Sequence, residues 1–160
     1  QIEVILDLEK NGGAQGVFHG MSEPDLQKFH ALPHTMIASD SGPRRFGNAV
    51  PHTLGYGNNA RVLGRYVREI NVLTLEEAVR KMTSLPAGRF QLEDRGVLRE
   101  GAFADVVTFD AARVADVATY QEPRQHPEGI GVVLVNGHLV VDGGRQVSTH
   151  AGRLLRRRSP

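Results

Sequence analysis

The spacing of the apolar residues changes near Gly96, and this change limits the folds open to the chain. Before Gly96 the apolar residues recur mainly at helical spacing, most clearly over 59–70 and 74–82. After it they form short runs rich in β-branched residues, which favour strands. These runs lie at 104–109, 131–135 and 138–141. The sequence therefore predicts an α/β chain with one part over residues 1–95 and a β-rich part over 96–160.

The first forty residues predict a strand, a helix and a second strand. An amphipathic helix opens the chain and stops at Asn11-Gly12-Gly13, because Asn and Gly accept the left-handed backbone that ends helices. A short strand is expected at 16–18, and Ser22 is the predicted N-cap of a helix that ends before Pro33. Residues 35–38 form a continuous run without alternation, which suits a strand covered on both faces of a parallel sheet. Such a unit is a right-handed crossover.

The middle of the chain predicts a long loop and two helices. Residues 42–57 carry glycine, proline, arginine and histidine without periodicity, which is typical of a loop. An amphipathic helix follows over 59–70. The next helix opens at Thr74, whose hydroxyl can form a capping box with Glu77, and we expect it to end at Pro86. In the β-rich part, Asn136-Gly137 predicts a type I′ hairpin, which Gly143-Gly144 ends.

Composition excludes several classes of protein. Nineteen Lys and Arg against eighteen Asp and Glu leave a net charge of +1, so the charge favours neither nucleic acid nor a membrane surface as a partner, and the arginines near the C-terminus are expected to be solvated. No apolar run approaches the ~20 residues that cross a bilayer. Without cysteine, a metal site has to use His, Asp or Glu, and a cytoplasmic location is expected. Gln1 lies within a helical pattern, so we expect the chain to be a piece of a longer protein.

Asp40 is the strongest candidate for chemistry. It follows the predicted strand and opens the long loop, which is where barrel enzymes place active-site residues. A carboxylate there can bind a cation or accept a proton from water, although Ser39-Asp40-Ser41-Gly42 is also ordinary turn chemistry. His19 follows a predicted strand in the same way, and His52 lies in the loop. The seven histidines form neither His-x-His nor His-Glu-x-x-His, so they do not by themselves predict a metal site.

Several blocks of the sequence resemble one enzyme family. These blocks are 36–40 (Met-Ile-Ala-Ser-Asp), 50–52, 61–69, 81–87, 94–96, 101–105 and 133–137. In order and spacing they resemble the C-terminal part of the N-acyl-D-amino-acid deacylases, the D-aminoacylases of the amidohydrolase superfamily. The resemblance covers essentially the whole chain.

This resemblance implies a fold, a reaction and a role for Asp40. The fold would be the last strands and helices of a (β/α)8 barrel over 1–95, followed by a β-rich segment of a small β-sandwich domain over 96–160. Asp40 matches the aspartate of the family's eighth strand, which binds or adjoins zinc and acts as general base toward the water that attacks the N-acyl carbonyl. By their positions in the sequence, and not by the resemblance, Ser39 and His52 are candidates to contact the small-molecule substrate, and His19 is a further candidate zinc ligand.

The resemblance also implies that this chain lacks most of the metal site. The family's His-x-His, its bridging ligand and two further histidines would lie upstream of Gln1, in the remainder of the barrel, so we expect the chain alone to be inactive. The loop departs from the family as well, since Pro51-His52-Thr53-Leu54 stands where many members have Pro-His-Pro-Arg. The alternative is a non-catalytic binding or structural module derived from the same fold. Histidines encoded upstream would distinguish the two.

Overall fold

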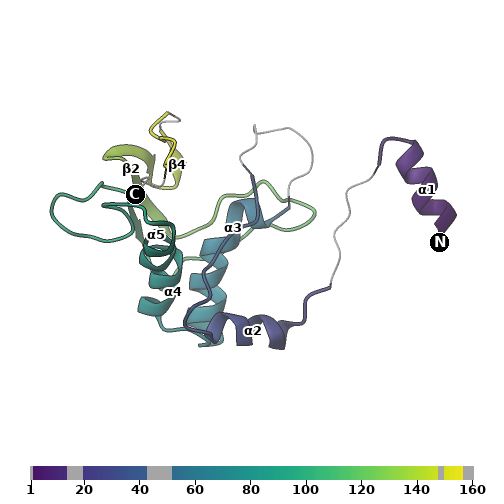
Figure 1. Cartoon of the computed structure of the whole chain (residues 1–160), viewed down its shortest axis with the longest axis horizontal. Helices are drawn as coiled ribbons and strands as arrows, with labels where there is room; N and C mark the ends of the chain where they lie inside the picture. The colour runs from purple at the N-terminus through teal and green to yellow at the C-terminus, as the bar shows by residue number, and fades with distance from the viewer. Residues whose placement is uncertain (1, 14–19, 43–51, 148–149, 157–160) are drawn as a thin grey trace.

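The computed structural model describes residues 2–13, 20–42, 52–147 and 150–156, with helices in the first part and an antiparallel sheet in the second (Figure 1). The helical elements are α1 (Ile2–Lys10), α2 (Glu23–Ala31), α3 (Leu54–Arg61), the π-helix η1 (Val62–Glu69), α4 (Leu75–Met82) and α5 (Ser84–Phe90). The strands are β1 (Val106–Phe109), β2 (Ile130–Val135), β3 (His138–Asp142) and β4 (Arg145–Gln146). Every described helix ends before Gly96 and every described strand begins after it, as the apolar spacing predicts. None of these helices is long and apolar enough to cross a membrane.

The four strands pair in the order β1-β2-β3-β4, each antiparallel to its neighbour. The predicted hairpin between β2 and β3 is confirmed. Asn136 and Gly137 take φ values of 51° and 81°, the two positive values that a type I′ turn needs. Gly143 and Gly144 also have positive φ, and the chain turns there into the short strand β4.

A polar network fastens the segment before β1 to this hairpin. The Arg95 guanidinium pairs with Asp105, donates to Asn136 Oδ1 at 2.5 Å and lies 4.2 Å from the Phe103 ring centroid. Asn136 in turn donates from its side chain to the carbonyl of Ala151 at 2.7 Å. The network therefore joins the loop after α5, the β2–β3 turn and the C-terminal segment.

Two of the predicted helix ends are confirmed. Gly12 and Gly13 follow α1 with φ values of 97° and 78°. Thr74 caps α4, its hydroxyl oxygen accepting a hydrogen bond from the Glu77 amide at 3.2 Å. Ser22 lies at the N-cap of α2, as predicted, but its side chain makes no capping hydrogen bond.

Other helix boundaries differ from the prediction. The helix expected over 59–70 begins at Leu54, within the predicted loop, and continues from α3 into η1. Pro86 does not end the helix that opens at Thr74, because that helix already ends at Met82. Pro86 instead lies in the first turn of α5, where its missing N–H leaves no intrahelical hydrogen bond unmade.

The strand predicted over 35–38 does not form. The segment is extended, and the Ile37 amide donates to the Lys81 carbonyl of α4 at 3.2 Å. A strand needs a neighbouring strand to satisfy its backbone groups, and the described part of the chain places none beside it. The run at 16–18, expected as the other strand, lies outside the described residues.

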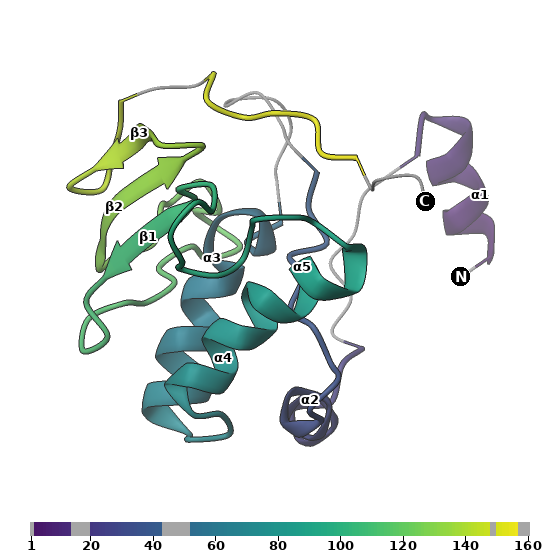
Figure 2. The same cartoon turned by 60° about the vertical axis from the view of Figure 1, so that its left-hand side comes forward.

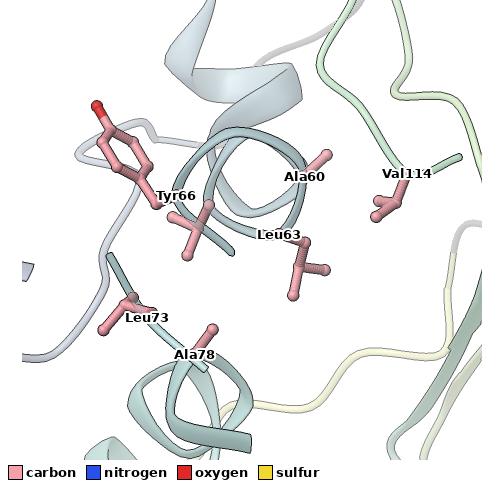
Figure 3. Close-up of a cluster of buried hydrophobic side chains, with 7 residues drawn as sticks. Ala60, Leu63, Tyr66, Leu73, Ala78 and Val114 are labelled. Atoms are coloured by element: carbon pink, nitrogen blue, oxygen red, sulfur yellow. The ribbon is translucent and has the colours of Figure 1, made fainter. Parts of the chain in front are cut away.

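The core lies between α3, η1, α4 and the loop that follows β1 (Figure 3). Its labelled side chains are Ala60, Leu63, Tyr66, Leu73, Ala78 and Val114. Phe109 of β1 and Ile130 of β2 pack against this cluster, so the sheet and the helices share it. Figure 2 shows the continuous helix of α3 and η1 next to α4 and the sheet, with η1 in contact with α4 and with α1 apart from them. All nine residues of α1 are exposed.

Candidate active site

Asp40 lies at the end of the extended segment that follows α2. Its side chain is exposed, and its backbone has φ 48°, in the left-handed region. Asp and Asn enter this region more readily than most residues with a side chain, because their short polar groups bond locally. The carboxylate therefore lies at a turn of the chain, where solvent or a neighbouring group can contact it.

Ser39 and Ser41 connect this turn to the rest of the molecule. Ser39 is half-buried and lines a groove of about 800 Å³ between the helices and the sheet. Ser41 lies against the first turn of α3, where a Cβ added to Gly55 would stand 2.6 Å from Ser41 Oγ. A side chain at position 55 would therefore displace the Ser41 hydroxyl.

The groove has a mainly apolar lining. Its residues come from α3, η1, α4, the sheet and neighbouring loops, and among them are Leu63, Met82, Val107, Ile130 and Val141. Of the predicted site residues that the structure describes, only Ser39 lines it, whereas Asp40 and His52 do not. The groove thus begins beside the Asp40 turn and is not centred on it.

His52 lies before α3 and is exposed. Its Nδ1 accepts a hydrogen bond from the Leu54 amide at 3.1 Å, and its ring stands edge-on to Tyr120 at 5.5 Å. Close by in the sequence, Tyr56 pairs with His126 at 5.7 Å. Tyr120 and His126 belong to the segment between β1 and β2, and no sequence motif indicates that this segment meets α3.

Contacts among α2, η1 and α4 shift the pKa values of His30 and Tyr66. Burial lowers the pKa of His30, the charge of Lys81 lowers it further, and Glu23 opposes the shift. The His30 and Tyr66 rings pack together with their centroids 4.5 Å apart. Burial raises the pKa of the Tyr66 phenol, because it disfavours the charged phenolate. A neutral imidazole beside the Lys81 ammonium avoids a second buried positive charge.

The described residues do not form a metal site by themselves. Within 2–13, 20–42, 52–147 and 150–156, no three His, Asp or Glu side chains come together. Asp40 offers one carboxylate, while a catalytic zinc needs about three protein ligands. His19, the other candidate ligand, lies outside the described residues.

Comparison with known proteins identifies the family. The sequence model described as "Amidohydrolase family" matches residues 34–141. A D-aminoacylase of Alcaligenes xylosoxydans xylosoxydans is 43% identical over 155 residues, which is 97% of this chain and 31% of that protein. The chain therefore spans about a third of the length of that relative.

Comparison with solved structures identifies the same family. The crystal structure of a D-aminoacylase that defined a subset of amidohydrolases matches 86% of this chain and 28% of its own, with a TM-score of 0.80 and 44% identity. An N-acyl-D-glutamate deacylase from Bordetella bronchiseptica, solved with zinc and a phosphonate mimic of the tetrahedral intermediate, matches 75% of this chain and 25% of its own, with a TM-score of 0.70 and 48% identity. The fold is that of the corresponding part of these amidohydrolases, and the chain belongs to the amidohydrolase family.

Proposed function

We propose that this chain is the C-terminal part of a zinc-dependent amidohydrolase that cleaves the amide bond of N-acyl-D-amino acids. The observation that carries the proposal is the 43% identity to a D-aminoacylase over 97% of the chain. The 48% identity to a structure of an N-acyl-D-glutamate deacylase supports the same substrate class. The rest of the protein would be the main partner of these residues.

In this proposal, residues 1–95 complete a (β/α)8 barrel and residues 96–160 contribute to a small β-sandwich domain. The extended run at 35–38 would be the barrel's last strand, paired once the preceding strands are beside it. Its end would then lie at the face of the barrel where active sites form. The change from helices to an antiparallel sheet between Phe90 and Val106 supports a boundary near residue 95.

Asp40 would act as the general base. Its carboxylate accepts a proton from the water that attacks the acyl carbonyl and passes that proton to the leaving amine. Ser39, which precedes the predicted loop, and His52, which lies within it, would contact the substrate. The described residues supply one carboxylate and no complete metal site, so the zinc ligands would come mainly from the remainder of the barrel.

The proposal is tested with the enzyme of family length that contains these residues. Hydrolysis of N-acetyl-D-methionine, N-acetyl-D-glutamate and their L enantiomers is followed by release of the free amine, with zinc present. We expect hydrolysis of at least one D substrate and a clear preference over its enantiomer. No hydrolysis of any of the four by folded, zinc-loaded enzyme would reject the proposed function.

A further inference from the structure

Lys81 of α4 is a charged residue in the interior to which the proposed reaction gives no role. Its side chain has no exposed surface, and it is the only charged residue that is buried among those the structure describes. A buried ammonium is costly unless each of its three N–H donors has a partner. The hydrogen-bond partners of the Lys81 ammonium therefore indicate which part of the chain this charge stabilises.

All three partners of the Lys81 ammonium can be identified. Its Nζ donates to the carbonyl of Leu32 and to the carbonyl of Thr35, the latter at 3.1 Å. The third partner is Glu77 Oε1 at 3.5 Å, one turn earlier on α4. Lys81 thus holds both ends of the turn that leaves α2 and opens the extended segment.

The backbone of Lys81 contacts the same segment again. Its carbonyl accepts a hydrogen bond from the Ile37 amide at 3.2 Å. The neighbouring Arg80 donates to the carbonyl of Pro33, between the two carbonyls that Lys81 holds. Residues 32–37 are therefore fixed to α4 at four points, and Asp40 follows three residues after the last of them.

We propose that Lys81 is a positioning residue for Asp40, an inference that rests on the proposed function. The short extended segment between Ile37 and Asp40 transmits a shift of the turn at 32–35 to the carboxylate. A general base that is displaced by about 1 Å can lose up to about a hundredfold in rate. An apolar residue would fill the same space on α4, but it would remove the Lys81 donor from both carbonyls, and of the two only the Leu32 carbonyl has a further donor in the described residues, the Thr35 amide.

The test compares Lys81→Met with Lys28→Met in the family-length enzyme. Lys28 is the matched control because it is an exposed lysine of α2 that pairs with Asp25 on the same helix. With rates divided by the concentration of folded, zinc-loaded enzyme, we expect kcat of Lys81→Met to fall by about tenfold to a hundredfold, because the base is misplaced. KM should change little, since Lys81 lies beneath the segment and does not reach the substrate. The Lys28→Met variant should keep both constants.

A double-mutant cycle separates positioning from a general structural role. In the Asp40→Asn background, Lys81→Met should lower kcat by less than about twofold, because the base through which Lys81 acts is already gone. A purely structural effect of Lys81 would persist in that background.

Two outcomes would overturn the inference while leaving the proposed function intact. One is a folded Lys81→Met enzyme with wild-type kcat, and the other is an equal loss with and without Asp40. If Lys81→Met does not fold, Lys81→Gln is measured in the same way, because its shorter neutral side chain cannot hold both carbonyls. A wild-type kcat in Lys81→Gln would likewise overturn the inference. Failure of the proposed function would be seen separately, as a wild-type enzyme that hydrolyses no N-acyl-D-amino acid.

Discussion

Asp40 combines an exposed carboxylate with a left-handed backbone, and the second property decides which substitution can test the first. Alanine lacks the short polar side chain that makes φ 48° acceptable, so it would disturb the turn as well as remove the base. Asparagine keeps the shape and enters the left-handed region as readily, while it loses the proton acceptor. The informative substitution at this position is therefore Asp40→Asn.

Glu77 gives a prediction about pH. The hydrogen bond from Arg80, at 2.7 Å, lowers the pKa of Glu77 from 4.5 to about 2, with help from the charge of Lys81. A carboxyl group whose pKa is lowered by folding stabilises the folded state above its unfolded pKa, and this contribution is lost as the pH falls toward the folded pKa. The free energy of unfolding should therefore exceed that of Glu77→Gln by a constant amount above pH 4.5, and by less at each step toward pH 2.

Denaturant unfolding of both proteins between pH 6 and pH 3 measures this difference. Glu76→Gln, in the exposed first turn of the same helix, is the matched control. A Glu77→Gln difference that stays constant down to pH 3 would show that the ion pair does not form.

At the residue scale, the sequence predicts local contacts and misses distant ones. The Thr74 cap could be predicted because its partner, Glu77, is three residues away. The buried position of Lys81 could not be, because the carbonyls that it binds lie 49 and 46 residues earlier in the chain. Asp40 could be singled out by its place after an apolar run, and Ser39-Asp40-Ser41-Gly42 is typical of a turn, but the sequence does not indicate which of these residues takes the left-handed backbone.

At the scale of elements, the packing of η1 depends on a close backbone approach. A Cβ at Gly64 would lie 2.8 Å from the carbonyl oxygen of Val114, and one at Gly129 would lie 2.5 Å from the Val114 amide nitrogen. Helical spacing predicts a helix over this region, but it contains no information about which loop lies against it. The start at Leu54 and the π geometry of η1 are therefore beyond what the pattern can predict.

Gly64→Ala tests this approach. The added methyl group would meet backbone, which cannot rotate away, so we expect a loss of about 1–3 kcal/mol in the free energy of unfolding. Gly88→Ala in α5 is the matched control, because nothing lies within 4 Å of a Cβ there. Alanine favours helix by up to about 1 kcal/mol over glycine, so this control should be neutral or stabilising. Thermal or urea unfolding that shows equal stability for the two variants would contradict the packing described.

The run at 35–38 shows a second limit of the sequence at this scale. Its composition predicts a strand covered on both faces, and this prediction is wrong for the described residues, because strand pairing is a property of two segments. The observed hydrogen bond from Ile37 goes to α4. The pairing of β2 with β3 was predictable because β3 follows β2 directly, with Asn136-Gly137 between them.

At the scale of the whole molecule, the change from helices to strands near Gly96 could be predicted from apolar spacing alone. The complete metal site could not be predicted in this way, because Asp40 is a single carboxylate and the other metal ligands would come from other parts of the barrel. The 160-residue chain by itself is thus expected to hold zinc no better than weakly. Calorimetric titration with zinc, with circular dichroism to show that the helices are present, measures this. One tightly bound zinc per chain would mean that histidines of this chain converge on a metal site of their own.

The most direct test of Asp40 as the general base is the kcat of Asp40→Asn in the family-length enzyme. Hydrolysis of an N-acyl-D-amino acid is measured at saturating zinc and substrate, with circular dichroism to confirm folding and with Asp25→Asn, an exposed carboxylate of α2, as control. Loss of the general base predicts that kcat falls by about 10²–10⁴, while the control keeps the wild-type value. An Asp40→Asn enzyme that is folded and retains more than about a tenth of the wild-type kcat would contradict the assignment of Asp40 as the base.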